Sequence, residues 1–230
     1  PLGLRLALAR EMVQIGTLAG RDMSAVISDM DQPLGYAVGN ALEVKEAIAT
    51  LNGNGPEDLR ELVLVLTSLM VVKAGKAKDI REARILLEET LDSGKALQVM
   101  KEWIVAQGGT AEEVEHPDLL PQALCQEAVC AEKSGFVTKI HTEEIGRICM
   151  LLGGGRAKKG DPIDLSVGLV LRKKVGDPVH SGESLAILHA NDREKLAEAK
   201  ERLLKAYEIK KEPVAVRPLI WKILDGTEAE

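Results

Sequence analysis

Apolar residues recur at helical spacing along the first half of the chain. Over residues 4–19 they lie three or four residues apart, which predicts an amphipathic helix that ends at Gly20. The same spacing predicts further helices at residues 40–51, 58–74, 80–93 and 95–107. The helix at residues 58–74 is long and apolar, so we expect it to be buried.

One strand-like run interrupts these helices, at residues 23–27. It is the single strand that the pattern predicts before residue 110. The backbone groups of a strand need partners, so the rest of its sheet must lie elsewhere. We expect that sheet upstream of the first residue, which predicts that the chain is a piece of a larger protein.

The pattern changes after Pro117 and Pro121, where we place a domain boundary. Domain 1–121 is mostly helical, and domain 122–230 is predicted to be mixed α+β. The elements expected in the second domain are a segment 124–131 leading into a strand at 135–140, a helix at 142–152 opened by Thr142, strands at 164–171 and 184–189, a charged helix at 191–209 capped by Asn191, and a strand or short helix at 214–224.

Composition excludes several classes of partner. A net charge of -6 gives no electrostatic reason to expect nucleic acid or an acidic membrane surface, and 2% aromatic residues are too few for base stacking. The sequence has neither an apolar run of about 18 residues nor a signal peptide. The 3 cysteines form no CxxC pair, so we expect reduced, mostly buried thiols in a cytoplasmic protein.

The most specific stretch is SDMDQPLGYAVGNALEVKEA, residues 28–47. Pro33 and Gly35 make a central strand there unfavourable, so carbonyl oxygens of this loop can point inward. The helix that follows carries Glu43 and Glu46 on roughly one face. Carbonyls with one carboxylate suit a hard cation, and a single carboxylate suits a monovalent one. The residue types alone equally describe a loop before a helix whose dipole favours glutamate.

This stretch resembles the pyrimidine-nucleoside and thymidine phosphorylase family, through Asp29-Met30, Pro33-Leu34-Gly35 and the run from Val38 to Val44. The similarity continues through Leu91 to Ala96, Gly153 to Arg156 and Val167-Gly168. The resemblance implies an α/β fold class, with the second half of the phosphorylase α/β domain followed by a small barrel-sandwich, hammerhead-like α+β domain.

The same resemblance implies a potassium ion held by the carbonyls of Leu34 and Ala37 and by the carboxylate of Glu46. It also implies that the remaining ligands and all phosphate- and base-binding segments lie outside this chain. We therefore expect no catalytic or substrate-binding residue here. The intact protein would be a homodimeric pentosyltransferase that uses phosphate to cleave uridine, thymidine or deoxyuridine, and this chain alone would be inactive.

A glycine-rich loop at Gly153 to Arg156 is the one further candidate for anion binding. It follows a helix, whereas phosphate-binding loops precede one, so it is better read as a helix stop and surface loop. Because the resemblance implies that this region lies near the mouth of the active site, an assisting role for Arg156 is kept as a hypothesis.

Two glycine–acid turns, Gly176-Asp177 and Gly182-Glu183, resemble half of a biotinyl or lipoyl carrier domain. The lysine hairpin of such carriers is absent, so we expect the fold without the carrier chemistry. A non-catalytic binding or carrier-like module remains the alternative function, and an archaeal nucleotide phosphorylase is an alternative within the same family.

Overall fold

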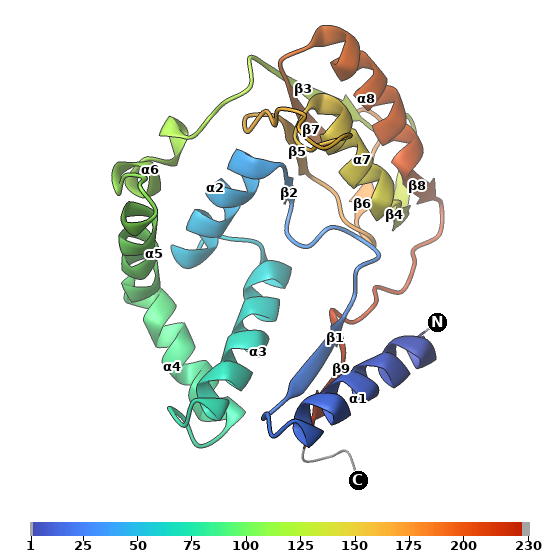
Figure 1. Ribbon diagram of the computed structural model, residues 1–230. Helices are drawn as coiled ribbons and strands as arrows, with labels where there is room; N and C mark the ends of the chain where they lie inside the picture. Colours follow the sequence, from blue (N-terminus) through green and yellow to red (C-terminus); the bar gives the residue numbers. More distant parts are fainter. Residues whose placement is uncertain (1, 227–230) are drawn as a thin grey trace. The chain divides into compact units, whose positions relative to one another are not determined.

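The computed structural model describes residues 2–226 and has the mixed α/β class expected from the sequence. Its elements form two compact units, each assembled from separate parts of the chain (Figure 1). Of the described residues, unit 1 contains 2–29, 58–90 and 217–226, and unit 2 contains 30–57 and 91–216.

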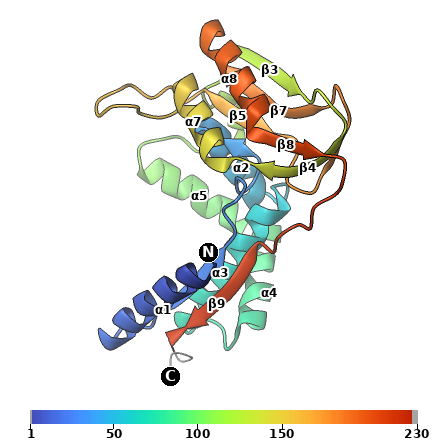
Figure 2. The same cartoon turned by 90° about the vertical axis from the view of Figure 1, so that its right-hand side faces the viewer.

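In unit 1 a helix covers a two-stranded antiparallel sheet. Helix α1 (Leu2–Leu18) packs on strands β1 (Ser24–Ser28) and β9 (Ile220–Asp225), around buried Val13, Ile27 and Leu224. Figure 2 shows the arrow of β9 beside α1. One partner of the early strand is therefore β9, near the end of the described chain, which the sequence analysis did not foresee. Local pattern could not reveal a pairing between residues about 200 positions apart, such as Ser24 and Asp225.

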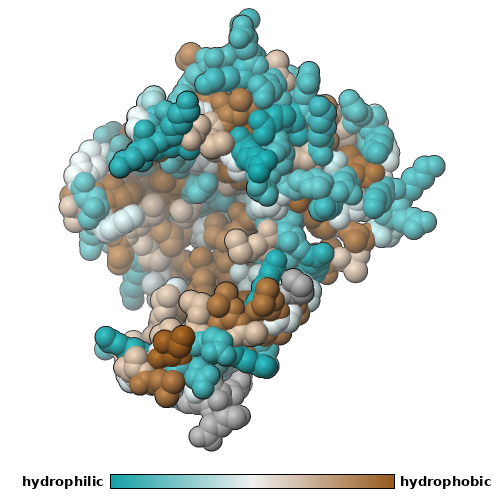
Figure 3. Space-filling view, turned by 45° about the vertical axis from the view of Figure 1, so that its right-hand side comes forward, coloured by the Kyte–Doolittle hydropathy of each residue, from teal (hydrophilic) through white to brown (hydrophobic). Residues whose placement is uncertain are grey.

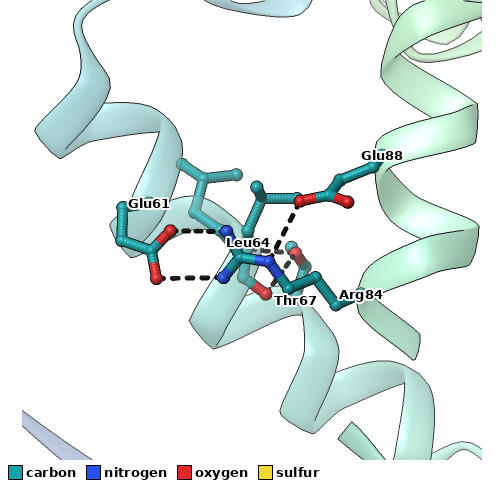
Figure 4. Close-up of polar contacts among 6 residues, drawn as sticks. Glu61, Leu64, Thr67, Arg84 and Glu88 are labelled. Atoms are coloured by element: carbon teal, nitrogen blue, oxygen red, sulfur yellow. Dashed lines mark hydrogen bonds and ion pairs between the residues drawn. The ribbon is translucent and has the colours of Figure 1, made fainter. Parts of the chain in front are cut away.

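The helices α3 (Glu57–Lys73) and α4 (Ile80–Asp92) are the other part of unit 1. The expectation of a buried α3 was wrong: only Leu64 and Ser68 of this helix are buried, and Met70 is 64% exposed. The helix is apolar on several faces, but one face alone packs in this chain. An ion pair joins the two helices, because Arg84 of α4 binds Glu61 of α3 through two hydrogen bonds of 2.9 and 2.6 Å (Figure 4).

Three helices of unit 2 begin and end close to where the sequence predicted, namely α2 (Asn40–Leu51), α5 (Lys95–Ala106) and α7 (Thr142–Leu152). The charged helix is α8 (Arg193–Ala206), and the short helix α6 (Glu112–Glu115) and a 3-10 turn at Pro117–Leu119 were not expected. Gly153, with φ 111°, ends α7 as expected.

The capping residues of two helices differ from the sequence-based expectation. Asp192, and not Asn191, caps α8, because its carboxylate accepts hydrogen bonds from the amides of residues 194 and 195. Thr142 does not cap α7, and its buried hydroxyl has no hydrogen-bond partner among the described residues. The charged helix also ends earlier than expected, because the chain from Tyr207 continues as a strand.

Two antiparallel sheets complete unit 2 and enclose its core. The four-stranded sheet has the order β2 (Ala37–Val38), β5 (Gly168–Leu171), β7 (Ser184–Ala190), β3 (Cys125–Cys130), and the three-stranded sheet has the order β6 (Pro178–Val179), β4 (Gly135–Ile140), β8 (Tyr207–Lys210). Helices α7 and α8 pack against each other and contribute Ile148 and Leu203 to the core. Hydrophobic burial here is the main stabilising term of the unit.

The three cysteines are free, but they are not mostly buried as expected. Cys149 alone is buried, Cys125 is half-buried and Cys130 is exposed. Burial, with a smaller contribution from the negative charge of Glu43, raises the pKa of the Cys149 thiol to about 11. This thiol therefore stays protonated at neutral pH.

Charged residues dominate the surface over α8, whereas apolar side chains lie along α1 (Figure 3). Leu8, Ile15 and Leu18 of α1 are 61%, 65% and 82% exposed. Of the helices described here, none combines the length and the apolar character that crossing a membrane requires.

The Glu61–Arg84 pair predicts a pH-dependent contribution to the stability of unit 1. The hydrogen bond from Arg84 lowers the pKa of Glu61 and outweighs the opposing effect of burial. A carboxyl group with a lowered pKa in the folded state stabilises above its unfolded pKa, and the contribution is lost as pH falls. Both side chains are more than a third exposed, so Glu61→Gln should cost no more than about 1 kcal/mol at pH 7 and almost nothing at pH 3.

Urea unfolding followed by Trp221 fluorescence in a Trp103→Phe background tests this prediction, because Trp221 lies in β9 of unit 1 and Trp103 in α5 of unit 2. Exposed Glu89, on the same helix as Arg84, provides the control variant Glu89→Gln. A loss of stability in Glu61→Gln that is equally large at pH 7 and pH 3 would contradict the ion-pair explanation.

Candidate functional site

The loop at residues 30–39 is built into the four-stranded sheet of unit 2. Its last residues form β2, where Ala37 lies opposite Val170 and Val38 opposite Leu169 of β5. The strands approach most closely at two glycines. A Cβ atom on Gly39 would lie 2.4 Å from the carbonyl oxygen of Val167, and one on Gly168 would lie 2.1 Å from that of Val38. Both glycines have positive φ, so this contact needs glycine on both strands.

Glu46, one of the predicted ligands, reaches back from α2 to the loop. Its Oε1 accepts hydrogen bonds from the amides of Tyr36 (2.9 Å) and Ala37 (3.0 Å). Its Oε2 lies so close to Gly35 that a Cβ atom there would be 2.1 Å away. Gly35 also has φ 66°, in the left-handed region. The carboxylate and the loop are therefore fitted to each other, as a loop that presents oxygen atoms requires.

The antiparallel pairing also sets the direction of the Ala37 backbone. The amide of Leu171 donates to the carbonyl of Tyr36 (2.8 Å), whereas the amide of Tyr36 is bonded to Glu46, so this pair forms one ladder hydrogen bond. By the alternation of an antiparallel ladder the next pair, Ala37 and Val170, is of the kind whose amides and carbonyls point away from the partner strand. The Ala37 amide is accordingly bonded to Glu46, and the same alternation predicts that its carbonyl points away from β5.

The two glutamates of α2 have different contacts. Glu43 accepts a hydrogen bond from the amide of Gly39 (3.0 Å) at the start of the helix, where a negative charge is favoured by the helix dipole. Glu46, one turn later, binds the loop. The sequence placed both on one face, and the structure assigns the capping role to Glu43 and the loop contact to Glu46.

Lys174 is a residue of this site that the sequence analysis missed. Its side chain is buried, with 8% of the residue exposed, and its Nζ donates a hydrogen bond to the carbonyl of Pro33. The same Nζ lies 5.3 Å from the centre of the Tyr36 ring, within the range of a cation–π interaction. A lysine between two strands looks like a surface residue in the sequence, and only its position opposite the loop distinguishes it.

The Gly153–Arg156 loop contacts the first residue of α2, directly after the loop at residues 30–39. The carbonyl of Gly154 accepts a hydrogen bond from Asn40 (3.0 Å), and that of Gly153 accepts one from the Asp164 amide (2.9 Å). A cavity of about 680 Å³ beside the loop is lined by Arg147, Met150, Leu151, Gly153, Gly155, Ala157, Asp161, Pro162, Lys195 and Arg202. Arg156 is exposed and does not line this cavity.

Asp164 orders the segment between this loop and β5. Burial alone would raise its pKa, but hydrogen bonds from the hydroxyl and amide of Ser166 and from Asn191 outweigh burial and lower it. Asn191 also accepts a hydrogen bond from the amide of Leu124 (2.7 Å). These contacts explain why Asn191 is not available as a helix cap.

Among residues 2–226 no cluster of three or more His, Cys, Asp and Glu side chains could hold a metal ion. A cation at the loop would therefore rely on backbone carbonyls together with Glu46. The amide of Ala37 contacts Glu46, and Leu34 lies in the same loop and is 38% exposed. This donor set is chemically suited to a hard monovalent ion.

Known proteins match both parts of the chain. The family model described as glycosyl transferase family, a/b domain, matches residues 5–97, and the pyrimidine nucleoside phosphorylase C-terminal domain matches residues 136–210. The pyrimidine-nucleoside phosphorylase of Geobacillus stearothermophilus is 51% identical over 215 residues, which are 94% of this chain and 49% of the relative. The chain belongs to the pyrimidine-nucleoside phosphorylase family. Pyrimidine-nucleoside phosphorylases of Bacillus subtilis (strain 168) and Staphylococcus aureus (strain bovine RF122 / ET3-1) are 58% and 55% identical over 80% of the chain, or 42% and 43% of the relatives.

The chain thus spans about half the length of the curated phosphorylases it matches. The matches also show where the candidate site lies with respect to the family's domains. Residues 30–39 and Glu46 fall in the glycosyl transferase match, whereas β5 and Lys174 fall in the C-terminal-domain match. A loop of one phosphorylase domain therefore completes the sheet of the other, and the contacts of this loop come from both.

The fit between Gly35 and Glu46 predicts that Gly35→Ala destabilises unit 2 of this phosphorylase chain more than backbone strain alone would. Gly53 has a similar φ, 80° against 66°, but a Cβ atom there would have no neighbour within 4 Å. Gly53→Ala should therefore cost about 1 kcal/mol. Gly35→Ala should cost roughly a further 1–3 kcal/mol, because the carboxylate must leave two amide groups without their acceptor.

Thermal and urea unfolding followed by circular dichroism compare the two variants with the wild type. Equal destabilisation by the two substitutions would show that the carboxylate moves away without loss, and would contradict the fitted arrangement of Gly35 and Glu46.

Proposed function

We propose that this chain is part of a pyrimidine-nucleoside phosphorylase. The enzyme is a pentosyltransferase that cleaves uridine, thymidine or deoxyuridine with phosphate as co-substrate, and releases a free pyrimidine and ribose or deoxyribose 1-phosphate. The observation that carries this proposal is the identity of 51% and 58% to enzymes of that name over 94% and 80% of the chain. The two family models match successive, non-overlapping ranges of the chain, which supports the same assignment.

The reaction needs groups beyond those that the described residues bring together. Phosphate must be held against the anomeric carbon, and the departing pyrimidine needs hydrogen-bond donors and positive charge near its carbonyls. Arg202, at the cavity of unit 2, already donates to Glu144 (2.6 Å). We therefore propose that the phosphate- and base-binding groups belong to the rest of a longer protein, and that the chain alone is inactive.

We also propose a potassium site in the loop at residues 30–39. Its ligands from this chain would be the carbonyl oxygens of Leu34 and Ala37 and the carboxylate of Glu46. The support is the direction of the Ala37 backbone, the position of Glu46 beside the same strand, and the preference of hard cations for such oxygen atoms. Three ligands are fewer than a hard cation usually takes, so others would come from outside this chain.

The remaining proposals follow from membership of the family. They are a division into an α/β part at residues 1–121 and a C-terminal domain at residues 122–230, a homodimeric enzyme, and action in the cytoplasm. An assisting role of Arg156 near the substrate is a further proposal. It is supported only by its exposed position, which leaves the guanidinium accessible to an anion.

The chain alone should show no turnover of uridine, thymidine or deoxyuridine with inorganic phosphate. Co-expression with the part of the Geobacillus stearothermophilus phosphorylase that this chain does not match should restore release of the free base, measured by liquid chromatography. Phosphorolysis by the chain alone would contradict its proposed inactivity. A co-purifying but inactive pair would contradict the assignment of the chain as a phosphorylase half.

The proposed potassium site predicts a stabilisation that KCl produces and choline chloride at equal ionic strength does not. In the complemented pair, Glu46→Gln should abolish this difference in melting temperature, because the amide keeps the shape but loses the charge that binds the cation. Glu43→Gln is the matched control, since Glu43 lies on the same helix and caps Gly39. A wild-type pair that melts at one temperature in both salts would rule out the site.

A further inference from the structure

The ammonium group of Lys174 lies buried against the loop at residues 30–39. Burying a charged group is unfavourable unless polar partners replace its water. Lys174 has such partners in the Pro33 carbonyl and the face of the Tyr36 ring. The two residues flank Leu34 and Gly35, so a single ammonium group contacts the loop on both sides of its central pair.

A second set of contacts from the same turn reinforces this attachment. The amide of Val175 donates to the side-chain carbonyl of Gln32 (2.9 Å). The turn itself is rigid, because Asp177 accepts a hydrogen bond from the Lys174 amide (2.7 Å) and Gly176 takes φ 99°. The Gly176-Asp177 turn thus has a role that its resemblance to carrier domains did not suggest: it presents Lys174 to the loop.

The loop is held by opposite charges from two directions. Glu46, from α2, accepts the amides of Tyr36 and Ala37, and Lys174, from the turn after β5, donates to the carbonyl of Pro33. Amide groups thus face the carboxylate and a carbonyl faces the ammonium group, which matches each backbone dipole to the charge that stabilises it.

We propose that Lys174 is the positioning residue of this loop, a built-in cation that keeps residues 33–37 in their folded arrangement before any metal ion binds. The argument rests on the contacts of Lys174 and goes beyond the proposed potassium site. Ordering a loop in advance removes the entropic cost of ordering it on binding, so the same residue would prepare the loop for a ligand.

Amide hydrogen exchange measured by mass spectrometry tests this proposal on the chain as it stands. In Lys174→Met, amides in the peptide covering residues 34–38 should exchange at least roughly tenfold faster, because hydrogen bonds to charged groups are among the stronger ones. The peptide covering β7, residues 184–190, should be unchanged. An unchanged loop peptide, or equal acceleration of both peptides, would overturn the proposal.

Lys173 supplies a matched control. It is the adjacent residue, and its Nζ also donates to a proline carbonyl, that of Pro178 (2.8 Å), but outside the loop. Lys173→Met should leave the 34–38 peptide as protected as in the wild type, and faster exchange there would overturn the proposal. Lys174→Gln, which keeps a donor without the charge, should lie between wild type and Lys174→Met. Full protection in Lys174→Gln would show that the charge is not required.

Repeating the measurement in choline chloride and in KCl separates this inference from the potassium proposal. A loop protected in choline chloride in the wild type supports Lys174 as its resident cation. Protection that appears in KCl alone would overturn the inference, because the ion would then be what orders the loop. Equal protection in both salts would support the role of Lys174 and count against potassium binding by this chain.

Discussion

The candidate site depends on a close approach of two backbone strands. At Gly39 and Gly168 the strands β2 and β5 lie so near each other that neither position has space for a Cβ atom. This contact fixes the end of the loop against the sheet of unit 2 and sets the starting point of α2. The positions of Glu46 on that helix, and of Lys174 beyond the end of β5, follow from it.

A loop that presents backbone oxygen atoms needs support from outside its own residues, because its carbonyls are not all used in a ladder. Here the support is electrostatic. The carboxylate of Glu46 binds amides of the loop, and the ammonium group of Lys174 binds a carbonyl. Lys174 is buried, which makes its hydrogen bond stronger than those of a partly exposed pair such as Arg84 with Glu61.

The arrangement also explains how two family domains meet in one structural unit. The loop lies in the glycosyl transferase match and β5 lies in the C-terminal-domain match. The two are nevertheless joined by strand pairing and by the buried hydrogen bond from Lys174 to the carbonyl of Pro33. The boundaries of the two compact units differ from those of the two family matches, because β9, from the last part of the chain, pairs with β1.

The sequence by itself determined the helices, the glycine stops and the family. Periodic apolar residues and residues with special backbone freedom act over a few positions, so α2 and α7 begin and end where the pattern predicted. The motif at residues 28–47 carried the proposed ligands Leu34, Ala37 and Glu46 through resemblance. Tertiary structure alone decided the partner of β1, the exposure of α3, the choice of Asp192 over Asn191 as a cap and the position of Lys174. Each of these depends on contacts between residues far apart in the chain, and such contacts are set by packing, which local residue patterns do not encode.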